Sequence, residues 1–310
     1  MQIRENYSLK PYNTFGIDVK AKYFSGFQSV DELKEILTSQ FSILNFQLIL
    51  GGGSNLLFTK DVDGIVLKNE IKGIAIIDED NDFVYVKAGA GINWHEFVLY
   101  CLHNNYAGVE NLSLIPGNVG ASPMQNIGAY GVEIKDVFHQ LEAYHINEKI
   151  LKTFSLEDCE FGYRESVFKR KYKNEFVITS VSFRLRKTPV FNTSYGVIQQ
   201  ELDKMAVKEL SIQVISKAVI NIRSSKLPDW KKLGNAGSFF KNPLIAQHEF
   251  YELKRMYSNI PGYIIDEKFT KLAAGWLIEQ CGWKGYRKGD AGCYAKQALV
   301  LVNYGNATGR

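Results

Sequence analysis

The sequence predicts a mixed α and β protein with two or three domains. Its 310 residues exceed the length at which a single hydrophobic core keeps growing. Short apolar strands that run into glycine turns alternate with segments of helical period, and there is no internal repeat or low-complexity tract. A hydrophobic content of 45% and a charged content of 23% are those of an ordinary globular protein.

Composition and residue spacing exclude several classes of protein. A net charge of +4 fits an anionic small-molecule ligand and is too small for a nucleic-acid-binding surface. The N-terminus has no apolar signal region, and no apolar run approaches the length of a membrane span. The four cysteines lack C-x-x-C pairing and the five histidines lack metal-ligand spacing. We therefore expect a reduced, cytoplasmic protein without a structural metal.

The first glycine turn follows a predicted helix and strand. Ser29 and Glu32 have the spacing of a capping box at the start of the helix. Residues 46–50 form a short apolar strand that leads into a turn whose backbone N–H groups suit an anion. A dinucleotide fingerprint needs a further glycine where Leu56 stands, so this is either a diphosphate-binding turn of another family or a plain strand-end turn. The turn consists of Gly51, Gly52, Gly53, Ser54 and Asn55.

A second glycine turn follows the strand predicted at residues 83–87. It also fails the dinucleotide fingerprint, because Trp94 stands at the third glycine position. Two glycine turns that are both off-pattern argue against a Rossmann domain but fit a different kind of dinucleotide site. A helix follows, and its predicted buried face consists of Trp94, Phe97, Val98, Cys101 and Leu102.

A long stretch without charge, residues 111–131, is the strongest candidate for a ligand site. It holds four glycines and two prolines but no Asp, Glu, Lys or Arg, and glycine lets the backbone come close to a ligand. Its backbone amides and neutral side chains suit a flat, uncharged heterocycle whose rim needs hydrogen bonds. The alternative is a long surface loop, which the lack of charge and the many apolar residues disfavour. The neutral polar side chains are Asn118, Ser122, Gln125 and Asn126.

The second half of the chain contains a strand, two helices and a candidate anion-binding arginine. Residues 175–186 alternate, which predicts a strand with Val177, Thr179, Val181, Phe183 and Leu185 on one side. Arg164, between aromatic residues and glycine, is either a carboxylate partner for a ligand or a surface arginine paired with a nearby acid. Further helices are predicted up to about Arg223 and at residues 271–280, with a domain boundary near residues 210–228.

Together these segments resemble one family, the UDP-N-acetylenolpyruvoylglucosamine reductases, which are FAD-dependent enzymes of peptidoglycan precursor synthesis. The matching segments occur in the same order over nearly the whole chain, so the match is more specific than any single motif. Residues 194–196 look like the tyrosine loop of the type I branch. The matching segments are residues 13–17, 51–55, 115–117, 125–131, 163–164, 234–243, 274–278 and 297–303.

The resemblance implies an α+β fold and a flavin-dependent reaction. Two FAD-binding subdomains of the vanillyl-alcohol-oxidase type are expected at residues 1–70 and 71–212, and a UDP-sugar-binding domain at residues 213–310. In the implied cycle NADPH reduces non-covalently bound FAD, and the flavin N5 then delivers hydride to UDP-N-acetylglucosamine enolpyruvate to form UDP-N-acetylmuramate. The expected partner is this small molecule only, with no nucleic acid or membrane, and the expected state is a monomer.

The family's functional positions transfer to particular residues of this chain. Arg164 is expected to bind the substrate carboxylate and stabilise the charge that develops on it, and Ser238 to protonate the carbanion. The positions implied for FAD are Gly51, Gly52, Gly53, Ser54, Asn55, Pro116, Gly117, Gly120, Ala121, Gln125, Asn126, Gly128, Ala129 and Tyr130. The positions implied for the uridine diphosphate or the sugar are Tyr195, Lys226, Asn242 and Gln297.

The sequence departs from the family pattern at its end. Family members end with a further helix and strand that supply a catalytic glutamate, whereas this sequence stops at residues 306–310. We therefore expect a C-terminally incomplete third domain. A non-catalytic or weakly active protein that binds flavin and a sugar nucleotide is the alternative reading. A covalent-flavin oxidase has little support, because no histidine lies in the glycine-rich stretches.

Overall fold

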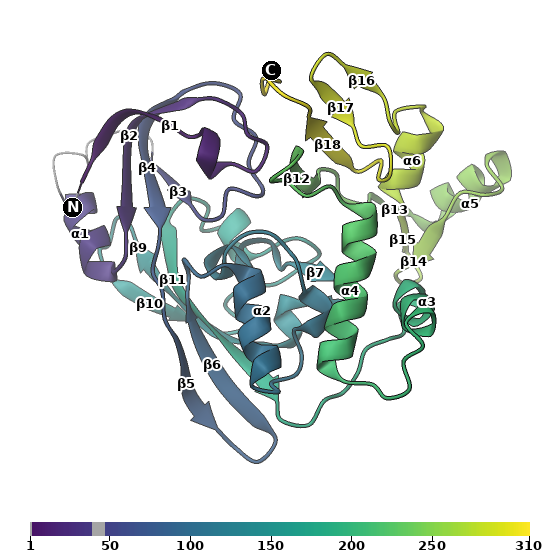
Figure 1. The fold of residues 1–310 in the computed structure, drawn as a ribbon, viewed down its shortest axis with the longest axis horizontal. Coiled ribbons are helices and arrows are strands. Elements are labelled where there is room, and N and C mark those ends of the chain that lie inside the picture. Colours follow the sequence, from purple (N-terminus) through teal and green to yellow (C-terminus); the bar gives the residue numbers. More distant parts are fainter. Residues whose placement is uncertain (1, 39–46) are drawn as a thin grey trace. The chain divides into compact units, whose positions relative to one another are not determined.

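The computed structural model describes residues 2–38 and 47–310, and residue contacts divide the chain into two units (Figure 1). The N-terminal unit comprises residues 1–12, 19–53 and 60–225. The C-terminal unit comprises residues 13–18, 54–59 and 226–310. Two short segments from the start of the chain therefore belong with its last third. Phe46 of the first predicted strand lies outside the described residues.

The first sheet of the N-terminal unit has the strand order β1-β2-β4-β3. Its strands are β1 (Arg4–Ser8), β2 (Lys20–Phe27), β3 (Gln47–Leu50) and β4 (Val62–Asn69). The predicted helix is α1 (Val30–Thr38), which buries Leu33, Ile36 and Leu37. The Ser29 hydroxyl accepts a hydrogen bond from the Glu32 N–H at 3.1 Å, and the Glu32 carboxylate accepts one from the Gln28 N–H at 2.7 Å. The cap predicted at Ser29 is thus confirmed.

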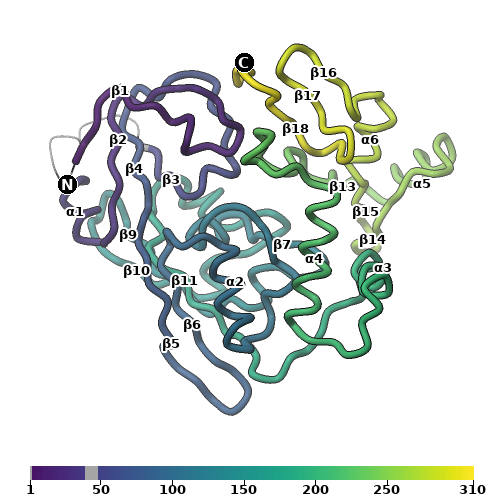
Figure 2. The backbone as a smooth tube through the Cα atoms, viewed as in Figure 1, coloured from purple at the N-terminus to yellow at the C-terminus, as the bar shows by residue number. Residues whose placement is uncertain are grey.

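The second sheet is antiparallel and has the order β10-β9-β11-β6-β5. Its strands are β5 (Ile74–Glu79), β6 (Phe83–Gly89), β9 (Phe138–His145), β10 (Leu151–Phe154) and β11 (Phe176–Arg186). The hairpin of β5 and β6 extends beyond the neighbouring strands (Figure 2). A hydrogen bond of 2.9 Å from the Asn69 side chain to the Ile178 carbonyl joins the two sheets.

Strand β11 is present as predicted, but the prediction that its alternating residues all lie on one side is wrong. Residues from Val177 to Phe183 are all buried. Val177 packs with the core around α1, whereas Val181 and Phe183 pack with the core around Trp94. The pairing with β9 shifts register between Ile178 and Ser180, which breaks the alternation. The strand is central in the sheet and contributes to both cores. The usual pattern of an antiparallel strand, with one face buried and the other exposed to solvent, therefore does not apply to it.

The helix after the second glycine turn is α2 (Trp94–His103), and its predicted buried face is confirmed. The Asn93 side chain caps it by accepting hydrogen bonds from the N–H groups of His95 at 2.9 Å and Glu96 at 3.2 Å. The Trp94 indole donates to the Leu112 carbonyl at 2.9 Å. These contacts attach the start of α2 to the beginning of the uncharged stretch.

Two further helices complete the N-terminal unit. They are α3 (Gly196–Lys204) and α4 (Ile212–Lys226), and they pack on each other through an apolar cluster. The second of them is the helix predicted to run to about Arg223, and it ends at Lys226. The cluster consists of Ile198, Leu202, Ile215, Ala218, Val219 and Ile222. Short elements of this unit are η1 (Lys10–Tyr12), η3 (Glu110–Leu112), η4 (Val119–Ala121), η5 (Pro123–Gln125), β7 (Gly128–Ala129), β8 (Val132–Glu133), η6 (Ile134–Asp136) and η7 (Val167–Lys169).

The C-terminal unit contains two small sheets, with the orders β12-β18-β17-β16 and β13-β15-β14. The helix predicted at residues 271–280 begins only at Ala274, because Lys271 and Leu272 belong to a strand. Gly282 ends it with a φ of 75°, as expected for a helix C-terminus, but Cys281 is exposed and not on an apolar face. The elements are β12 (Gly234–Ser238), β13 (Leu244–Ala246), α5 (Gln247–Met256), β14 (Gly262–Ile264), β15 (Phe269–Leu272), α6 (Ala274–Gln280), β16 (Arg287–Lys288), β17 (Ala291–Cys293) and β18 (Val300–Asn303).

Residues 13–18 belong to the C-terminal unit because they bind its first sheet. The Asn235 N–H donates to the Thr14 carbonyl at 2.9 Å, and the Asn303 side chain donates to the Phe15 carbonyl at 2.9 Å. A Cβ atom on Gly234 would overlap the Phe15 carbonyl, so only glycine allows this contact. The family-like segment at residues 13–17 therefore has a structural role.

We expect Asn93→Ala to lower the free energy of unfolding by about 1 kcal/mol, because two N–H groups of α2 lose their acceptor. Urea denaturation followed by circular dichroism measures this change. The matched control is Asn81→Ala in the exposed β5–β6 turn, with an expected change within about 0.5 kcal/mol. Equal changes in the two variants would show that the cap contributes nothing.

Candidate functional site

Three glycine-rich segments meet in the N-terminal unit. The segments are residues 51–53 after β3, residues 89–92 at the end of β6, and residues 117–121 of the uncharged stretch. Residues 89–92 and 117–121 are joined by two backbone hydrogen bonds, from the Val119 N–H to the Ile92 carbonyl at 2.8 Å and from the Gly120 N–H to the Ala90 carbonyl at 3.0 Å. The Trp94 N–H, at the start of α2, also donates to the Gly117 carbonyl at 2.9 Å. The two off-pattern glycine turns and the uncharged stretch thus form one site.

Glycine is required where these segments touch. A Cβ atom on Gly52 would lie 2.7 Å from the Gly117 Cα, and one on Gly120 would lie 2.5 Å from the Ala90 Cβ. Contacts this short force the backbone to move, since neither neighbour is the free end of a side chain. These glycines bring the backbones of separate segments into direct contact.

The amides of this surface are suited to an anion. In the described part of the chain, the backbone N–H groups of Gly52, Gly117 and Asn118 donate to no protein acceptor. Two lysines bind carbonyl groups of the same segments. The Lys68 ammonium donates to the Gly51 carbonyl at 2.5 Å, and the Lys72 ammonium donates to the Gly91 carbonyl at 2.9 Å. Burial lowers the pKa of Lys68. Free amides and nearby ammonium groups are the usual surroundings of a bound phosphate.

Side chains of the uncharged stretch mostly hold its shape. Asn126 has a φ of 45° and is fully buried, and its amide group donates to the Glu133 carboxylate at 2.9 Å and to the Gly162 carbonyl at 3.0 Å. Its side-chain oxygen accepts from the Lys135 N–H at 3.1 Å. Asn118 and Ser122 also donate to nearby carbonyls. In these parts of the stretch, the groups available to bind a ligand are therefore mainly backbone groups.

Arg164 lies against the end of this stretch. Its guanidinium donates to the Gly128 carbonyl at 2.5 Å and to the Asn126 carbonyl at 3.3 Å. The Glu133 carboxylate lies 3.5 Å from the same guanidinium, with both side chains partly exposed. A pair with a nearby acid, one of the two roles considered for Arg164, is thus present. The carbonyls fix the orientation of the guanidinium, and some of its five donors remain available.

Tyr130 and Tyr195 are in contact although they come from separate segments. Their rings meet edge to face, with centroids 5.7 Å apart. Burial raises the pKa of the Tyr130 hydroxyl, whereas Tyr195 is half exposed. A residue expected to bind the cofactor therefore touches one expected to bind the substrate.

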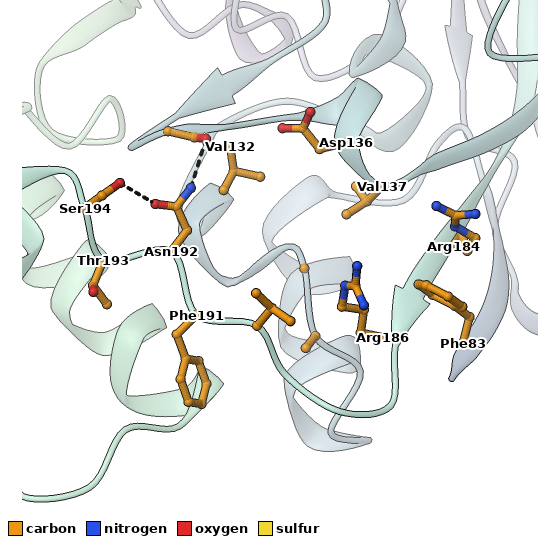
Figure 3. Close-up of a pocket in the computed structure, with 14 residues that line it drawn as sticks. Phe83, Val132, Asp136, Val137, Arg184, Arg186, Phe191, Asn192, Thr193 and Ser194 are labelled. Atoms are coloured by element: carbon orange, nitrogen blue, oxygen red, sulfur yellow. Dashed lines mark hydrogen bonds between the residues drawn. The ribbon is translucent and has the colours of Figure 1, made fainter. Parts of the chain in front are cut away.

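Two asparagines that the sequence analysis did not identify hold the Tyr195 segment in place. The Asn111 side chain donates to the carbonyls of Tyr130 at 3.0 Å and Asn192 at 2.9 Å. The Asn192 side chain donates to the Gly131 carbonyl at 3.1 Å and accepts from the Ser194 hydroxyl at 3.0 Å (Figure 3). Gly131, Asn192 and Ser194 border a pocket of about 640 Å³. No sequence signal links them, because they are 81 residues apart.

Arg184 and Arg186 line the same pocket, at the end of β11. Their guanidinium carbons lie 4.6 and 5.1 Å from the centroid of the Phe83 ring (Figure 3). Asp136 also borders the pocket, and its carboxylate accepts from the Glu133 N–H at 2.8 Å.

The C-terminal unit carries the remaining predicted positions. Ser238 is exposed at the end of β12, directly after Gly237, which has a φ of 68°. The Asn242 side-chain oxygen accepts from the Ala274 N–H at 3.0 Å, and the Gln297 side-chain oxygen accepts from the Leu299 N–H at 3.3 Å. The predicted residues of this unit are Ser54, Asn55, Lys226, Ser238, Asn242 and Gln297.

The other predicted positions all belong to the N-terminal unit. Within it, the glycines after β3 contact the uncharged stretch, and Arg164 and Tyr195 contact the far end of that stretch. The predicted residues of this unit are Gly51, Gly52, Gly53, Pro116, Gly117, Gly120, Ala121, Gln125, Asn126, Gly128, Ala129, Tyr130, Arg164 and Tyr195.

Other kinds of site are not found among the described residues. No group of three or more His, Cys, Asp or Glu residues there could hold a metal ion. All four cysteines are free thiols. None of the described helices combines the length and the apolar character that crossing a membrane requires.

Comparison with known families identifies the class of protein. A model described as an FAD binding domain matches residues 21–153, which contain the three glycine-rich segments. A model described as the C-terminal domain of UDP-N-acetylenolpyruvoylglucosamine reductase matches residues 229–310. The chain is an α+β oxidoreductase of the flavoprotein class, and residues 21–153 match an FAD binding domain.

Similar proteins then define the family. A UDP-N-acetylenolpyruvoylglucosamine reductase of Flavobacterium johnsoniae is 53% identical over 311 residues, which cover 100% of this chain and 92% of that protein. One from Pseudomonas putida is 49% identical over 309 residues, with coverages of 100% and 91%. The chain belongs to the UDP-N-acetylenolpyruvoylglucosamine reductase family. The crystal structure of such a reductase from Thermus caldophilus shares the fold, with a TM-score of 0.67, 23% identity and coverages of 99% and 90%.

We expect Gly52→Ala to weaken FAD binding by about tenfold or more, because the new methyl group pushes the first glycine turn away from Gly117. Fluorescence titration of the cofactor-free protein with FAD gives the dissociation constant. Gly196→Ala is the matched control, since a Cβ there meets nothing within 4 Å. Unchanged affinity in Gly52→Ala would rule out this surface as the FAD site.

Proposed function

We propose that this protein reduces UDP-N-acetylglucosamine enolpyruvate to UDP-N-acetylmuramate with NADPH as the electron donor, a step of peptidoglycan precursor synthesis. The observation that carries the proposal is the identity of about one half, over the full chain, to reductases of that name. Bound FAD supplies the transfer of hydride between NADPH and the substrate.

The surface formed by residues 51–53, 89–92 and 117–121 of the N-terminal unit is our candidate binding site for the FAD diphosphate. The free amides of Gly52, Gly117 and Asn118 would hold its oxygens, and Lys68 and Lys72 would offset its charge. The residues that follow in the uncharged stretch, which end at Tyr130, would border the flat ring system. Shape and backbone donors suit a neutral heterocycle here, since this stretch has no charged side chain of its own.

Arg164 is the candidate for binding the substrate carboxylate. Hydride addition to an enol ether next to a carboxylate places negative charge on the α-carbon and, by delocalisation, on the carboxylate oxygens. A guanidinium that is already oriented by the carbonyls of Asn126 and Gly128 can stabilise that charge without reorganising. The ion pair with Glu133 is partly exposed and long, so it competes only weakly with a ligand.

Ser238 is the candidate for the proton donor to the α-carbon. A serine hydroxyl is a weak acid, so it can give up its proton only if the alkoxide is stabilised as it forms. Its exposed position at the end of β12 leaves the hydroxyl open to a ligand. Tyr195, Lys226, Asn242 and Gln297 are the candidates for contacts to the uridine diphosphate and the sugar.

We also propose a domain organisation, a cellular location and an oligomeric state for the protein. Residues 1–70 and 71–212 would form the two parts of the FAD-binding module, and residues 213–310 the sugar-nucleotide domain. The protein would act in the cytoplasm as a monomer. Its product would feed cell wall biogenesis, on which cell shape and cell division depend. Oxidation of NADPH that depends on the enolpyruvyl substrate tests the activity directly, and a yellow protein without such activity would contradict it.

We expect Ser238→Ala to leave reduction of the bound FAD by NADPH unchanged and to slow its reoxidation by substrate by about 10²- to 10⁴-fold, because only the second half-reaction needs the proton. Stopped-flow absorbance at the flavin band measures each half-reaction. Ser258→Ala, at an exposed position of the same unit, is the control. Equal slowing of both half-reactions would remove Ser238 from the role of proton donor.

Arg164→Ala should weaken substrate binding and slow the second half-reaction by about 10²- to 10³-fold, since the developing charge loses its fixed partner. The same stopped-flow experiment, run over a range of substrate concentrations, separates the two effects. Arg170→Ala changes an exposed arginine of the same loop and should have no effect. A variant that binds substrate normally and reacts at the normal rate would assign Arg164 a purely structural role.

A further inference from the structure

The pocket between the end of β11 and residues 190–194 has no role in the proposed function (Figure 3). Its volume of about 640 Å³ lies within the usual range for sites that bind small molecules. None of its lining residues is a position that we assign to the cofactor or to the substrate. A ligand of this pocket would therefore be a further molecule.

Two arginines of β11 give this pocket a positive charge. Arg184 and Arg186 pair with Tyr85 and Phe83 of β6 in a regular part of the sheet. Residues two apart on a strand point to the same face, so the two arginine side chains extend from one face of the sheet. Both guanidinium carbons lie within 5.1 Å of the centroid of the Phe83 ring. One ligand group at this end of the pocket can therefore contact both guanidinium groups.

Neither arginine has an acidic partner in the part of the chain that the structure describes. The two guanidinium groups form no ion pair and no side-chain hydrogen bond there. Asp136 is the one carboxylate that borders the pocket among the described residues, and it accepts a hydrogen bond from the Glu133 N–H at 2.8 Å. Two cations that face one pocket without acidic partners favour a ligand group with two negative charges.

Much of the remaining lining of the pocket is apolar. It includes Val132, Val137, Val190 and Phe191. Val190 is 67% exposed, so the protein itself leaves apolar surface uncovered at this pocket. A ligand with an apolar body would remove part of this surface from water, which favours binding.

The segment that precedes Tyr195 forms another side of the pocket. The Asn192 side chain, which donates to the Gly131 carbonyl at 3.1 Å, accepts from the Ser194 hydroxyl at 3.0 Å, and both hydrogen bonds are exposed to solvent. Segments held by exposed hydrogen bonds open more easily than the core of a protein. A ligand that contacts this segment would make its opening less frequent.

We infer that this pocket binds a phosphomonoester with an apolar body, and that the bound ligand stabilises residues 190–195. A phosphomonoester carries nearly two negative charges at neutral pH, which match the two guanidinium groups of Arg184 and Arg186. The apolar body would lie against Val190 and Phe191. The inference does not depend on the proposed function, because the pocket uses other residues.

Phenyl phosphate is the probe for this site. We titrate it by calorimetry into the full chain with FAD bound and with UDP in excess, so that UDP occupies the proposed substrate site. The dissociation constant of phenyl phosphate should be about 1 mM or lower. Arg184→Met and Arg186→Met should each raise it about tenfold or more, because a hydrogen bond to a charged group is lost.

Two control variants show whether the probe binds in this pocket. Lys226→Met removes the lysine that we assign to the uridine diphosphate, and Arg170→Met removes an exposed arginine of the same unit. Each should leave the dissociation constant within about twofold of the value for the unchanged protein. Val190→Asp tests the pocket without changing an arginine. Its carboxylate should repel the phosphate and also weaken binding.

Hydrogen exchange tests the effect of the ligand on the segment before Tyr195. Phenyl phosphate should slow amide exchange at residues 190–195, whereas phenol, which lacks the phosphate, should not. The inference is overturned if there is no saturable binding below about 10 mM, or if both arginine variants bind the probe as well as the unchanged protein does. Binding without slower exchange at residues 190–195 would place the probe elsewhere and overturn the inference too.

Discussion

The close approach of backbone segments without side chains is the constraint on which the site depends. Gly52 meets Gly117 and Gly120 meets Ala90 at distances that leave no room for a Cβ atom. Hydrogen bonds of α2 and of residues 89–92 hold the uncharged stretch in this position. The amides of Gly52, Gly117 and Asn118, which come from two of these segments, have no acceptor among the described residues, and free main-chain N–H groups are what binding a phosphate requires.

Charge is distributed around this surface in a consistent way. The uncharged stretch has no charged side chain, yet four cations contact it or its neighbouring segments in the described part of the chain: Lys68, Lys72, Arg164 and Arg223. The first three donate to backbone carbonyls, and the Nε atom of Arg223 is buried with no hydrogen-bond partner among the described residues. Cations in these places match a ligand that is flat and neutral at one end and anionic elsewhere. The mild positive charge of the chain fits the same class of ligand.

Elements with a strong local signal were predicted well, and elements that depend on distant partners were not. The cap at Ser29 and the buried face of α2 follow from side chains three or four residues apart. The prediction that the alternating residues of β11 lie on one side is wrong, because its pairing with β9 shifts register and its residues pack in two separate cores. The helix predicted from residue 271 begins at Ala274, because Lys271 and Leu272 pair with β13 and β14. Strand pairing overrides helical spacing wherever the partner is far away in the sequence.

The sequence by itself determined the family, the order of the strong elements and the uncharged, glycine-rich character of the stretch that we propose as part of the cofactor site, because these depend on residue types and short spacings. Only the tertiary structure decided that residues 13–18 bind the sheet of the C-terminal unit, that Asn111 and Asn192 hold the Tyr195 segment, and that the buried Arg223 Nε atom has no hydrogen-bond partner among the described residues. The physical reason is that a hydrogen bond or a missing counter-ion depends on groups brought together from distant parts of the chain. Nothing in the local pattern of residues specifies which of these groups will meet.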